Sequence, residues 1–244
     1  MSTASLSLTG VRVVLCDADG NLFPSEEPAF VASAEVTSRF LAEHGVQRRY
    51  EAEELRLATT GMNFRSTVVA LAREHGLPEL SADVLEHWVQ TEKEAVTAYL
   101  RTALQPDPDV LGPLTALAEH HGLAAVSSSA DARIAACFEV TGMARFFPAE
   151  LRFSAEDSLP RPTSKPDPAI YQHALHTLGV EPEQAVAVED SVAGATSAVA
   201  AGIPTLGNLQ FVQPAEREER HALLTQAGVR TVVTSWAEVL DLVV

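Results

Sequence analysis

The sequence predicts an α/β protein in which a parallel sheet carries helices on both faces and an all-helical segment interrupts it. From residue 110 onward, short apolar runs alternate with helical patterns, and this alternation is typical of parallel βαβ units. The stretch 28–104 shows helical periodicity only, over more residues than a normal crossover uses. We therefore expect a core domain of residues 1–24 and 104–244 and an inserted helical domain of residues 25–103.

The first strand is predicted at 11–16, a β-branched apolar run that ends in the turn sequence Asp17-Ala18-Asp19-Gly20. Later strands share this short apolar character and are predicted at 123–126, 151–153, 185–188, 203–206 and 231–233. Helices are predicted between and after them, at 110–121, 132–140, 168–178, 192–201 and 215–227, with a last one from Trp236. The strands thus alternate with helices to the end of the chain.

Two apolar stripes predict helices in the insertion, at 30–41 and 85–100. The second stripe also holds Trp88 and Tyr99, which we interpret as core residues. The insertion ends before Pro106-Asp107-Pro108, where two prolines interrupt helical structure.

Composition excludes several classes of function. The 244 residues include 17 Lys and Arg against 33 Asp and Glu, a net charge of −16 that disfavours nucleic acid and anionic membranes as partners. The only cysteines, Cys16 and Cys137, lack the spacing of a zinc site or a disulfide scaffold. No apolar run is long enough to span a membrane, and residues 1–10 do not read as a secretory signal. These features predict a cytoplasmic protein.

Polar residues follow the predicted strands, at the sheet edge where ligands of open α/β proteins bind. They are Asp17 and Asp19, Ser127 to Ser129, Glu189 and Asp190, with Lys165 in the loop before the fourth strand. Several carboxylates in one cleft repel each other, and a hard divalent cation such as Mg²⁺ relieves that repulsion. The lysine and a hydroxyl are then available to an anionic substrate group. This combination favours phosphoryl chemistry.

Four motifs in this order resemble those of the haloacid dehalogenase superfamily. They are Asp17-Ala18-Asp19-Gly20, Ser127, Lys165-Pro166-Asp167-Pro168 and Glu189-Asp190-Ser191-Val192-Ala193-Gly194. The helical insertion resembles the cap of the β-phosphoglucomutase and phosphoglycolate phosphatase branch. The resemblance covers essentially the whole chain and implies a Rossmann-like, doubly wound core with a helical cap.

The resemblance also implies catalytic roles. Asp17 would be the nucleophile that attacks phosphorus and forms an aspartyl phosphate. Asp19 would protonate the leaving oxygen and then act as base toward water. Ser127 and Lys165 would hold the phosphoryl oxygens. Because the dehalogenase branch lacks the second aspartate, Asp19 favours phosphate esters over organohalides, and the expected substrate is a small phosphorylated metabolite such as a sugar phosphate.

A magnesium ion is the implied cofactor. Its expected ligands are the carboxylate of Asp17, the backbone carbonyl of Asp19 and the carboxylate of Asp190, with Glu189 in support. These are oxygen ligands, which Mg²⁺ prefers in proteins.

Three residues are candidate substrate contacts. Gly20 would let the backbone approach the phosphate closely, and Ser128 is a further candidate beside Ser127. Arg65, in the cap sequence 60–65, could bind a substrate anion. The chain departs from the family pattern at Asn21, where Thr or a small apolar residue is usual, and this places the geometry of the loop in question.

Two alternatives to a phosphatase stay open on the sequence. A phosphomutase of the same fold must exclude water and needs a second acid–base pair, but residues 23–28 contain no His and no candidate pair is evident. A receiver-like phosphate sensor also combines acids, Ser or Thr and Lys at strand ends. In receivers, however, the phosphorylated acid follows a later strand and no insertion of this size is expected.

Overall fold

The computed structural model describes residues 10–59 and 62–244. Residues 1–9, considered above for a targeting signal, and Thr60 and Gly61 of the cap sequence lie outside the described residues. The chain divides into two compact units. One is Ser25–Leu104, and the other comprises the chain up to Pro24 together with Gln105–Val244.

Within the described residues, the core unit contains one six-stranded sheet in the order β3-β2-β1-β4-β5-β6. The strands are β1 (Val13–Cys16), β2 (Gly122–Ser127), β3 (Arg152–Ser154), β4 (Ala185–Glu189), β5 (Thr205–Asn208) and β6 (Thr231–Val233). Every neighbouring pair is parallel. In the register, Cys16 lies beside Ala125 of β2 and Val188 of β4. The carboxyl ends of β1, β2 and β4 therefore meet at one edge, next to the point where the strand order reverses.

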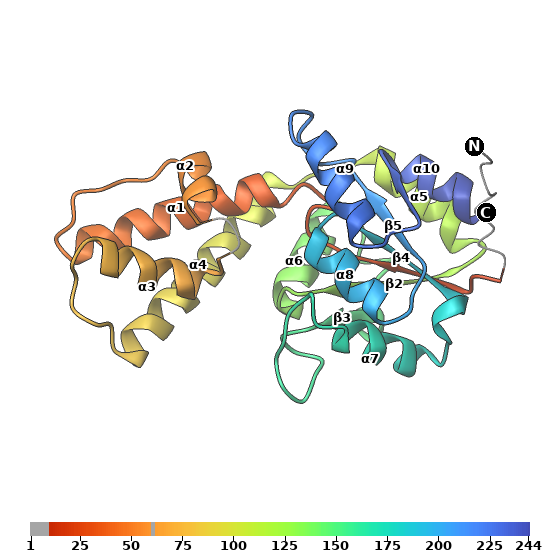
Figure 1. Ribbon diagram of the computed structural model, residues 1–244, viewed down its shortest axis with the longest axis horizontal. Helices are drawn as coiled ribbons and strands as arrows, with labels where there is room; N and C mark the ends of the chain where they lie inside the picture. The colour runs from red at the N-terminus through yellow and green to blue at the C-terminus, as the bar shows by residue number, and fades with distance from the viewer. Residues whose placement is uncertain (1–9, 60–61) are drawn as a thin grey trace. The chain divides into compact units, whose positions relative to one another are not determined.

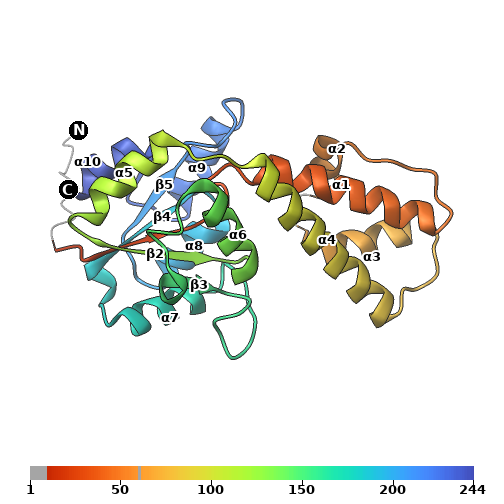
Figure 2. The ribbon, with the colours of Figure 1, turned by 180° about the vertical axis from the view of Figure 1, so that it is seen from behind.

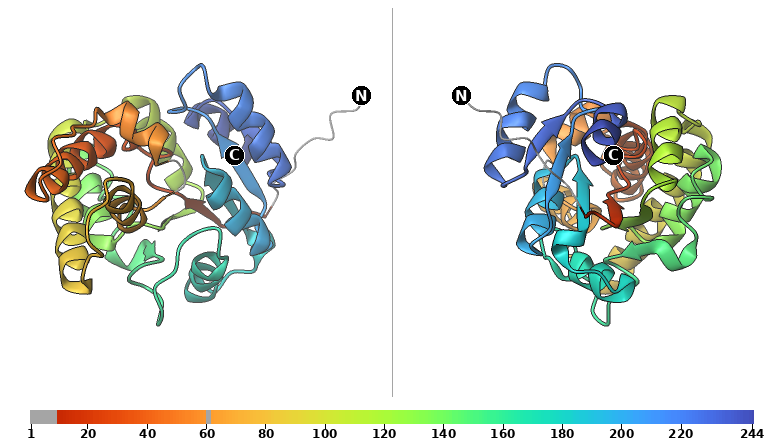
Figure 3. Two further views of the ribbon diagram at one scale, coloured as in Figure 1. Left: turned by 60° about the vertical axis from the view of Figure 1, so that its left-hand side comes forward. Right: turned by 90° about the vertical axis from the view of Figure 1, so that its right-hand side faces the viewer.

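Helices cover both faces of this sheet, as the views in Figures 1 to 3 show. They are α5 (Pro108–Ala118), α6 (Asp131–Thr141), α7 (Ala169–Leu178), α8 (Val192–Ala200), α9 (Arg217–Gln226) and α10 (Trp236–Val243). Single turns of 3₁₀ helix precede β3 at Ala149–Leu151 and β4 at Pro182–Gln184. Figure 2 shows α5 and α10 on the face opposite α7. This is the doubly wound α/β core that the sequence predicts.

Alternating side chains of the central strands build the core. Val13 and Leu15 of β1 pack with Ile170 and Tyr171 of α7 in one cluster of buried residues. The intervening residues point to the other face, so β1 is buried on both sides, as parallel strands usually are. Both cysteines are buried and free, in agreement with their spacing.

The Ser25–Leu104 unit is helical in its described part, with α1 (Glu26–Glu43), α2 (Ala52–Ala58), α3 (Phe64–Glu74) and α4 (Ala82–Ala103). Its core includes Trp88, which is 2% exposed and meets Phe40 edge-to-face at 5.5 Å between ring centroids. Tyr99 is 40% exposed, so its interpretation as a core residue was wrong. The buried stripe of α4 includes Val96 and Leu100, and Tyr99 points away from it.

One strand begins later than its sequence pattern indicates. β5 covers Thr205–Asn208, whereas the apolar run predicts 203–206. Pro204 has no N–H to donate to a neighbouring strand, and the N–H of Ile203 donates to Ala198 O at the end of α8. The shift places Asn208 at the carboxyl end of the strand.

Candidate active site

Asp17 lies directly after β1 at the meeting point of the strand ends. Its N–H donates to Val188 O at 3.0 Å, which continues the parallel pairing of β1 with β4. The residue is 7% exposed, so its carboxylate is largely removed from water. The geometry therefore presents the predicted nucleophile at the sheet edge in a poorly solvated position.

Lys165 brings two of the predicted acids together. Its Nζ donates to Asp17 Oδ1 at 2.5 Å, to Glu189 Oε1 at 2.6 Å and to Val126 O at 2.8 Å. Burial lowers the pKa of this lysine, but the adjacent Asp17 and Glu189 carboxylates outweigh burial and hold it above its usual value. Lys165 is therefore a protonated donor that links the loop before α7 to the ends of β1, β2 and β4.

The ionisation of Asp17 is disfavoured in the protein without a bound cation. Burial raises its pKa most, and the Lys165 ammonium opposes this shift. The negative charges of Glu189 and Asp19 add to the effect of burial, and the pKa of Asp17 rises to about 8. A nucleophilic carboxylate must be ionised, so this site needs additional positive charge near neutral pH.

Three carboxylates lie where a cation could supply that charge. One oxygen from each of Asp17, Glu189 and Asp190 lies within 4.8 Å of the others, and all three residues are buried. The buried Oε2 of Glu189 has no hydrogen-bond partner. An all-oxygen, acidic set of this kind fits a hard divalent ion, and Mg²⁺ fits the donor chemistry. The carboxylate of Asp19 is not in this set, and its backbone carbonyl stays a predicted ligand.

Two glycines leave the space that these acids occupy. Gly20 has φ +78°, and a Cβ there would lie 2.4 Å from Asp190 Oδ2. A Cβ on Gly194 in the first turn of α8 would lie 1.8 Å from Glu189 Oε2. The side chains of Glu189 and Asp190 therefore need the absence of a side chain at these positions. The N–H of Gly20 donates to Phe23 O at 3.0 Å, and a contact between Gly20 and substrate stays a prediction.

Asp19 points its carboxylate toward the loop after β2. Ser129 Oγ donates to Asp19 Oδ2 at 2.7 Å, and Arg133 Nη2 lies 3.2 Å from Asp19 Oδ1. The sequence analysis placed Ser129 at this sheet edge without giving it a role, and it did not identify Arg133. A polar residue one helical turn after the serines was the only sequence signal for Arg133.

The serines after β2 also organise their own loop. Ser127 is 2% exposed, and its Oγ accepts from the N–H of Ser129 at 3.0 Å. Ser128 Oγ accepts from the N–H of Lys165 at 3.1 Å, so it ties the β2 loop to the lysine loop. The structure thus places Ser128 beside Lys165 and Ser127 in the same loop after β2, and their contacts with substrate stay predictions.

Tyr171 is a site residue that the sequence analysis missed. Its hydroxyl donates to Glu189 Oε1 at 2.5 Å, and Lys165 Nζ lies 5.2 Å from the centroid of its ring. Burial and the charges of Glu189 and Asp17 raise its pKa, so the phenol stays protonated and acts as a donor. On the sequence Tyr171 is one apolar position of α7 among several.

Asn21, the departure from the family pattern, is fully buried and bonded. Its Nδ2 donates to Asp17 O at 2.9 Å and to Val188 O at 3.1 Å. The side chain therefore links the backbone after β1 to the backbone of β4. Asn21 thus gives the loop that carries Asp17 two side-chain hydrogen bonds to the strand ends.

Arg65 belongs to the Ser25–Leu104 unit, whereas the residues described above belong to the core unit. It occupies the first turn of α3, where its guanidinium pairs with the carboxylate of Glu86 in α4. Thr60 and Gly61 of the same sequence motif lie outside the described residues. The role of Arg65 toward substrate stays a prediction.

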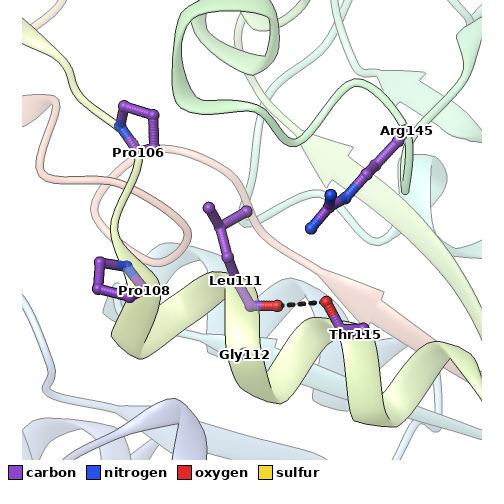
Figure 4. Close-up of a pocket in the computed structure, with 6 residues that line it drawn as sticks. All are labelled: Pro106, Pro108, Leu111, Gly112, Thr115 and Arg145. Atoms are coloured by element: carbon purple, nitrogen blue, oxygen red, sulfur yellow. Dashed lines mark hydrogen bonds between the residues drawn. The ribbon is translucent and has the colours of Figure 1, made fainter.

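The core unit also carries an open pocket of about 380 Å³. None of the predicted site residues lines it. Its lining residues, drawn in Figure 4, are Pro106, Pro108, Leu111, Gly112, Thr115 and Arg145. These residues include no carboxylate, so this pocket lacks the groups that the proposed chemistry needs.

Comparison with known proteins agrees with this geometry. A family model described as haloacid dehalogenase-like hydrolase matches residues 11–202. The 6-phosphogluconate phosphatase of Escherichia coli (strain K12) is 28% identical over 196 residues, which cover 80% of this chain and 81% of that protein. A CBBY-like protein of Arabidopsis thaliana is 48% identical over 54 residues, only 22% of this chain and 16% of that protein.

A solved structure shares the fold over nearly the whole chain. It is a HAD family hydrolase from Deinococcus radiodurans R1 with bound phosphate and sodium. The two are 26% identical with a TM-score of 0.67, and the match covers 96% of this chain and 97% of that one. No helix among the described residues has both the length and the apolar character needed to cross a bilayer.

Proposed function

The chain belongs to the haloacid dehalogenase-like hydrolase family, and we propose that it is a Mg²⁺-dependent phosphatase of a small phosphorylated metabolite. The observation that carries this proposal is the placement of Asp17, whose carboxylate lies 2.5 Å from Lys165 Nζ and clusters with Glu189 and Asp190. The name of the Escherichia coli relative and the phosphate in the Deinococcus radiodurans structure support a phosphate monoester as substrate.

In the first half of the proposed reaction, the Asp17 carboxylate attacks phosphorus. The new bond joins a carboxylate oxygen to phosphorus, and the bond between phosphorus and the substrate's ester oxygen breaks. Asp19 gives its proton to that leaving oxygen, which departs as an alcohol. Lys165 donates to the charge that develops on the phosphoryl oxygens, and Ser127 would donate to the same oxygens.

In the second half, water releases the phosphate. Asp19, now ionised, takes a proton from the water as its oxygen bonds to phosphorus. The bond between phosphorus and the Asp17 oxygen breaks, inorganic phosphate leaves, and both carboxyl groups return to their starting states. One aspartate thus serves as acid and then as base.

Mg²⁺ bound among Asp17, Glu189 and Asp190 would neutralise the excess negative charge of the site and of the substrate phosphate. The raised pKa of Asp17 supports this role of the cation, because a positive charge nearby favours the ionised form of the nucleophile. Asp19 would add its backbone carbonyl.

The Ser25–Leu104 unit is the cap in this proposal. Arg65 is its candidate contact for a substrate anion, and it would exchange its present partner Glu86 for that anion. A sugar phosphate or a sugar-acid phosphate is the substrate class that we propose. The relative's name points to the same class.

The test is phosphate release from a panel of phosphorylated metabolites, including sugar phosphates and 6-phosphogluconate. Wild type is measured with Mg²⁺ and with EDTA, beside Asp17→Asn and the matched control Asp241→Asn on the exposed side of the last helix. We expect release that depends on Mg²⁺, is lost in Asp17→Asn and is retained in Asp241→Asn. Acid-quenched wild type should carry covalent phosphate, and Asp17→Asn should not.

Product analysis separates hydrolysis from isomerisation. A phosphatase yields one inorganic phosphate for each dephosphorylated product, whereas a mutase returns the phosphoryl group to the substrate and yields an isomer. Release that persists in Asp17→Asn would contradict the proposed nucleophile, and isomer formation without release would favour the mutase.

A further inference from the structure

We infer that Arg133, together with Ser129, positions the carboxylate of Asp19 for acid and base catalysis. Ser129 Oγ donates to Asp19 Oδ2 at 2.7 Å, and Arg133 Nη2 lies 3.2 Å from Asp19 Oδ1. Each carboxylate oxygen thus has its own partner, so both the rotation and the reach of the group are set. The inference rests on the proposed function, because it takes Asp19 as the acid and base.

Asp19 needs such support because its side chain is partly exposed to solvent. Its side chain is 24% exposed, in contrast to the buried Asp17, Glu189 and Asp190. A carboxylate at the edge of water samples several rotamers unless partners select one. Acid–base catalysis needs the proton within hydrogen-bond distance of its target, and a misplacement of about 1 Å costs about 100-fold in rate.

The backbone of Ser129 and the start of α6, which carries Arg133, are held in place by β3 and the loop after it. Ser154 Oγ donates to Ser129 O at 2.8 Å. The N–H of Asp131 donates to Asp157 Oδ2 at 2.7 Å, and the Asp131 carboxylate pairs with Arg152 at 2.9 Å. The loop after β2 is therefore held by contacts that do not involve Asp19.

The geometry of its donors explains why an arginine suits this position. Arg133 lies in the first turn of α6, and its side chain is 28% exposed. Its planar guanidinium directs N–H groups along fixed lines, which fits the orientation of a carboxylate better than a mobile ammonium does. Lys165 contacts Asp17 and Glu189, so Arg133 gives Asp19 a cation of its own.

Removing the guanidinium tests the inference. Arg133→Met keeps most of the side-chain volume and loses the charge and the donors, and Arg133→Lys restores a charge without the planar geometry. Arg230→Met, on an exposed residue before β6, is the matched control. Two substrates are compared: p-nitrophenyl phosphate, and the alkyl monoester of the panel that wild type hydrolyses fastest.

For the alkyl monoester, we expect kcat of Arg133→Met to fall about 10- to 100-fold with KM within about twofold of wild type. Arg133→Lys should recover part of the loss, and Ser129→Ala should lower kcat in the same direction. With p-nitrophenyl phosphate the leaving group needs no proton, so phosphoenzyme formation should persist while its breakdown by water slows. Acid-quenched Arg133→Met should then hold more covalent phosphate than wild type.

Several results would overturn the inference. They are a kcat of Arg133→Met within twofold of wild type, a loss confined to KM, and unchanged phosphoenzyme on p-nitrophenyl phosphate. Equal losses in Arg230→Met would show a general effect of removing a surface charge. These outcomes differ from failure of the proposed function, in which wild type itself forms no phosphoenzyme or Asp17→Asn stays active.

Discussion

Asn208 Nδ2 donates a 2.9 Å hydrogen bond to Asn21 Oδ1 in the interior of the core unit. Asn21 extends this hydrogen-bond network, because its own Nδ2 donates to Asp17 O and Val188 O. The indole N–H of Trp236 donates to Asn21 O at 2.8 Å. Asn21 therefore joins the end of β5 through its side-chain amide, and the start of α10 through its backbone carbonyl, to the backbone that carries the nucleophile.

The first prediction concerns this pair of amides. Asn21→Thr and Asn208→Ala should each lower the free energy of unfolding by about 1–3 kcal/mol, because each leaves buried polar groups without partners. The double variant should cost clearly less than the sum, since the second change removes a group that the first already left unpaired. Urea unfolding with a constant m-value measures all three variants. Strictly additive losses would show that the two side chains do not depend on each other.

These long-range contacts mark the limit of what the sequence could predict. The strands, the helical insertion and the acids after β1 and β4 follow from local patterns, and the predicted and observed bounds differ by about two residues or fewer for most elements. Asn21 and Asn208 are 187 positions apart, and Asp19 and Arg133 are 114 apart. No periodicity links such pairs, because their contact depends on the register of the folded sheet.

The topology of a parallel sheet explains why the main site residues could nonetheless be predicted from the sequence. Asp17 and Glu189 each follow a predicted strand, Lys165 lies in the loop before the predicted helix 168–178, and parallel strands bring their ends to one edge. Tyr171 was missed for the opposite reason. It belongs to a helix whose apolar face packs on the sheet, and only the hydroxyl contact with Glu189 distinguishes it from its neighbours.

The second prediction follows from that hydroxyl. Tyr171→Phe keeps the ring and removes the donor to Glu189, so it should lower the free energy of unfolding by about 1.5–3 kcal/mol, the usual value for a hydrogen bond to a charged group. Activity should fall as well, because Glu189 also orients Lys165. Tyr99→Phe on the exposed part of α4 is the control and should leave both quantities unchanged.

The pH dependence of the Tyr171→Phe effect is part of this prediction. The pKa of the buried phenol is raised, so the hydroxyl stays protonated throughout the neutral range. The ratio of wild-type to variant kcat should therefore be constant from about pH 6 to about pH 9. A ratio that changes across this range would mean that Tyr171 titrates, in conflict with its burial.

The third prediction uses two glycines that differ in what surrounds them. Gly194→Ala places a Cβ 1.8 Å from Glu189 Oε2, so the carboxylate must move. Gly112→Ala in α5 meets nothing within 4 Å. Replacing Gly by Ala inside a helix ordinarily stabilises it by about 1 kcal/mol. Pro113 follows Gly112 and disfavours helical backbone at a residue that carries a Cβ, which opposes this gain. We therefore expect Gly112→Ala to change the melting temperature little and to leave activity unchanged.

Gly194→Ala, by contrast, should lower the melting temperature and strongly reduce phosphate release. Thermal unfolding and the panel assay measure both variants under the same conditions. A Gly194→Ala protein with wild-type stability and activity would show that Glu189 does not need its observed place against α8.

The last prediction concerns pH and Mg²⁺. The pKa of Asp17 is about 8 in the folded protein against 3.8 for a free side chain, so between these values the folded chain binds a proton that the unfolded chain lacks. The stability from this group is fully present below about pH 4 and is lost as pH rises toward 8. Without Mg²⁺, the free energy of unfolding of wild type should therefore decrease from pH 5.5 to pH 8 relative to Asp17→Asn, by at most about 1.4 kcal/mol per pH unit.

Added Mg²⁺ should change this dependence, because the cation binds the ionised carboxylates and competes with the proton. The rise in melting temperature that Mg²⁺ produces should be larger at pH 8 than at pH 6 in wild type and much smaller at both in Asp17→Asn. Differential scanning calorimetry at fixed ionic strength, with NaCl replacing MgCl₂ in the control, measures each value. An equal Mg²⁺ shift at the two pH values, or the same pH slope in Asp17→Asn, would place the titrating group or the cation elsewhere than at Asp17.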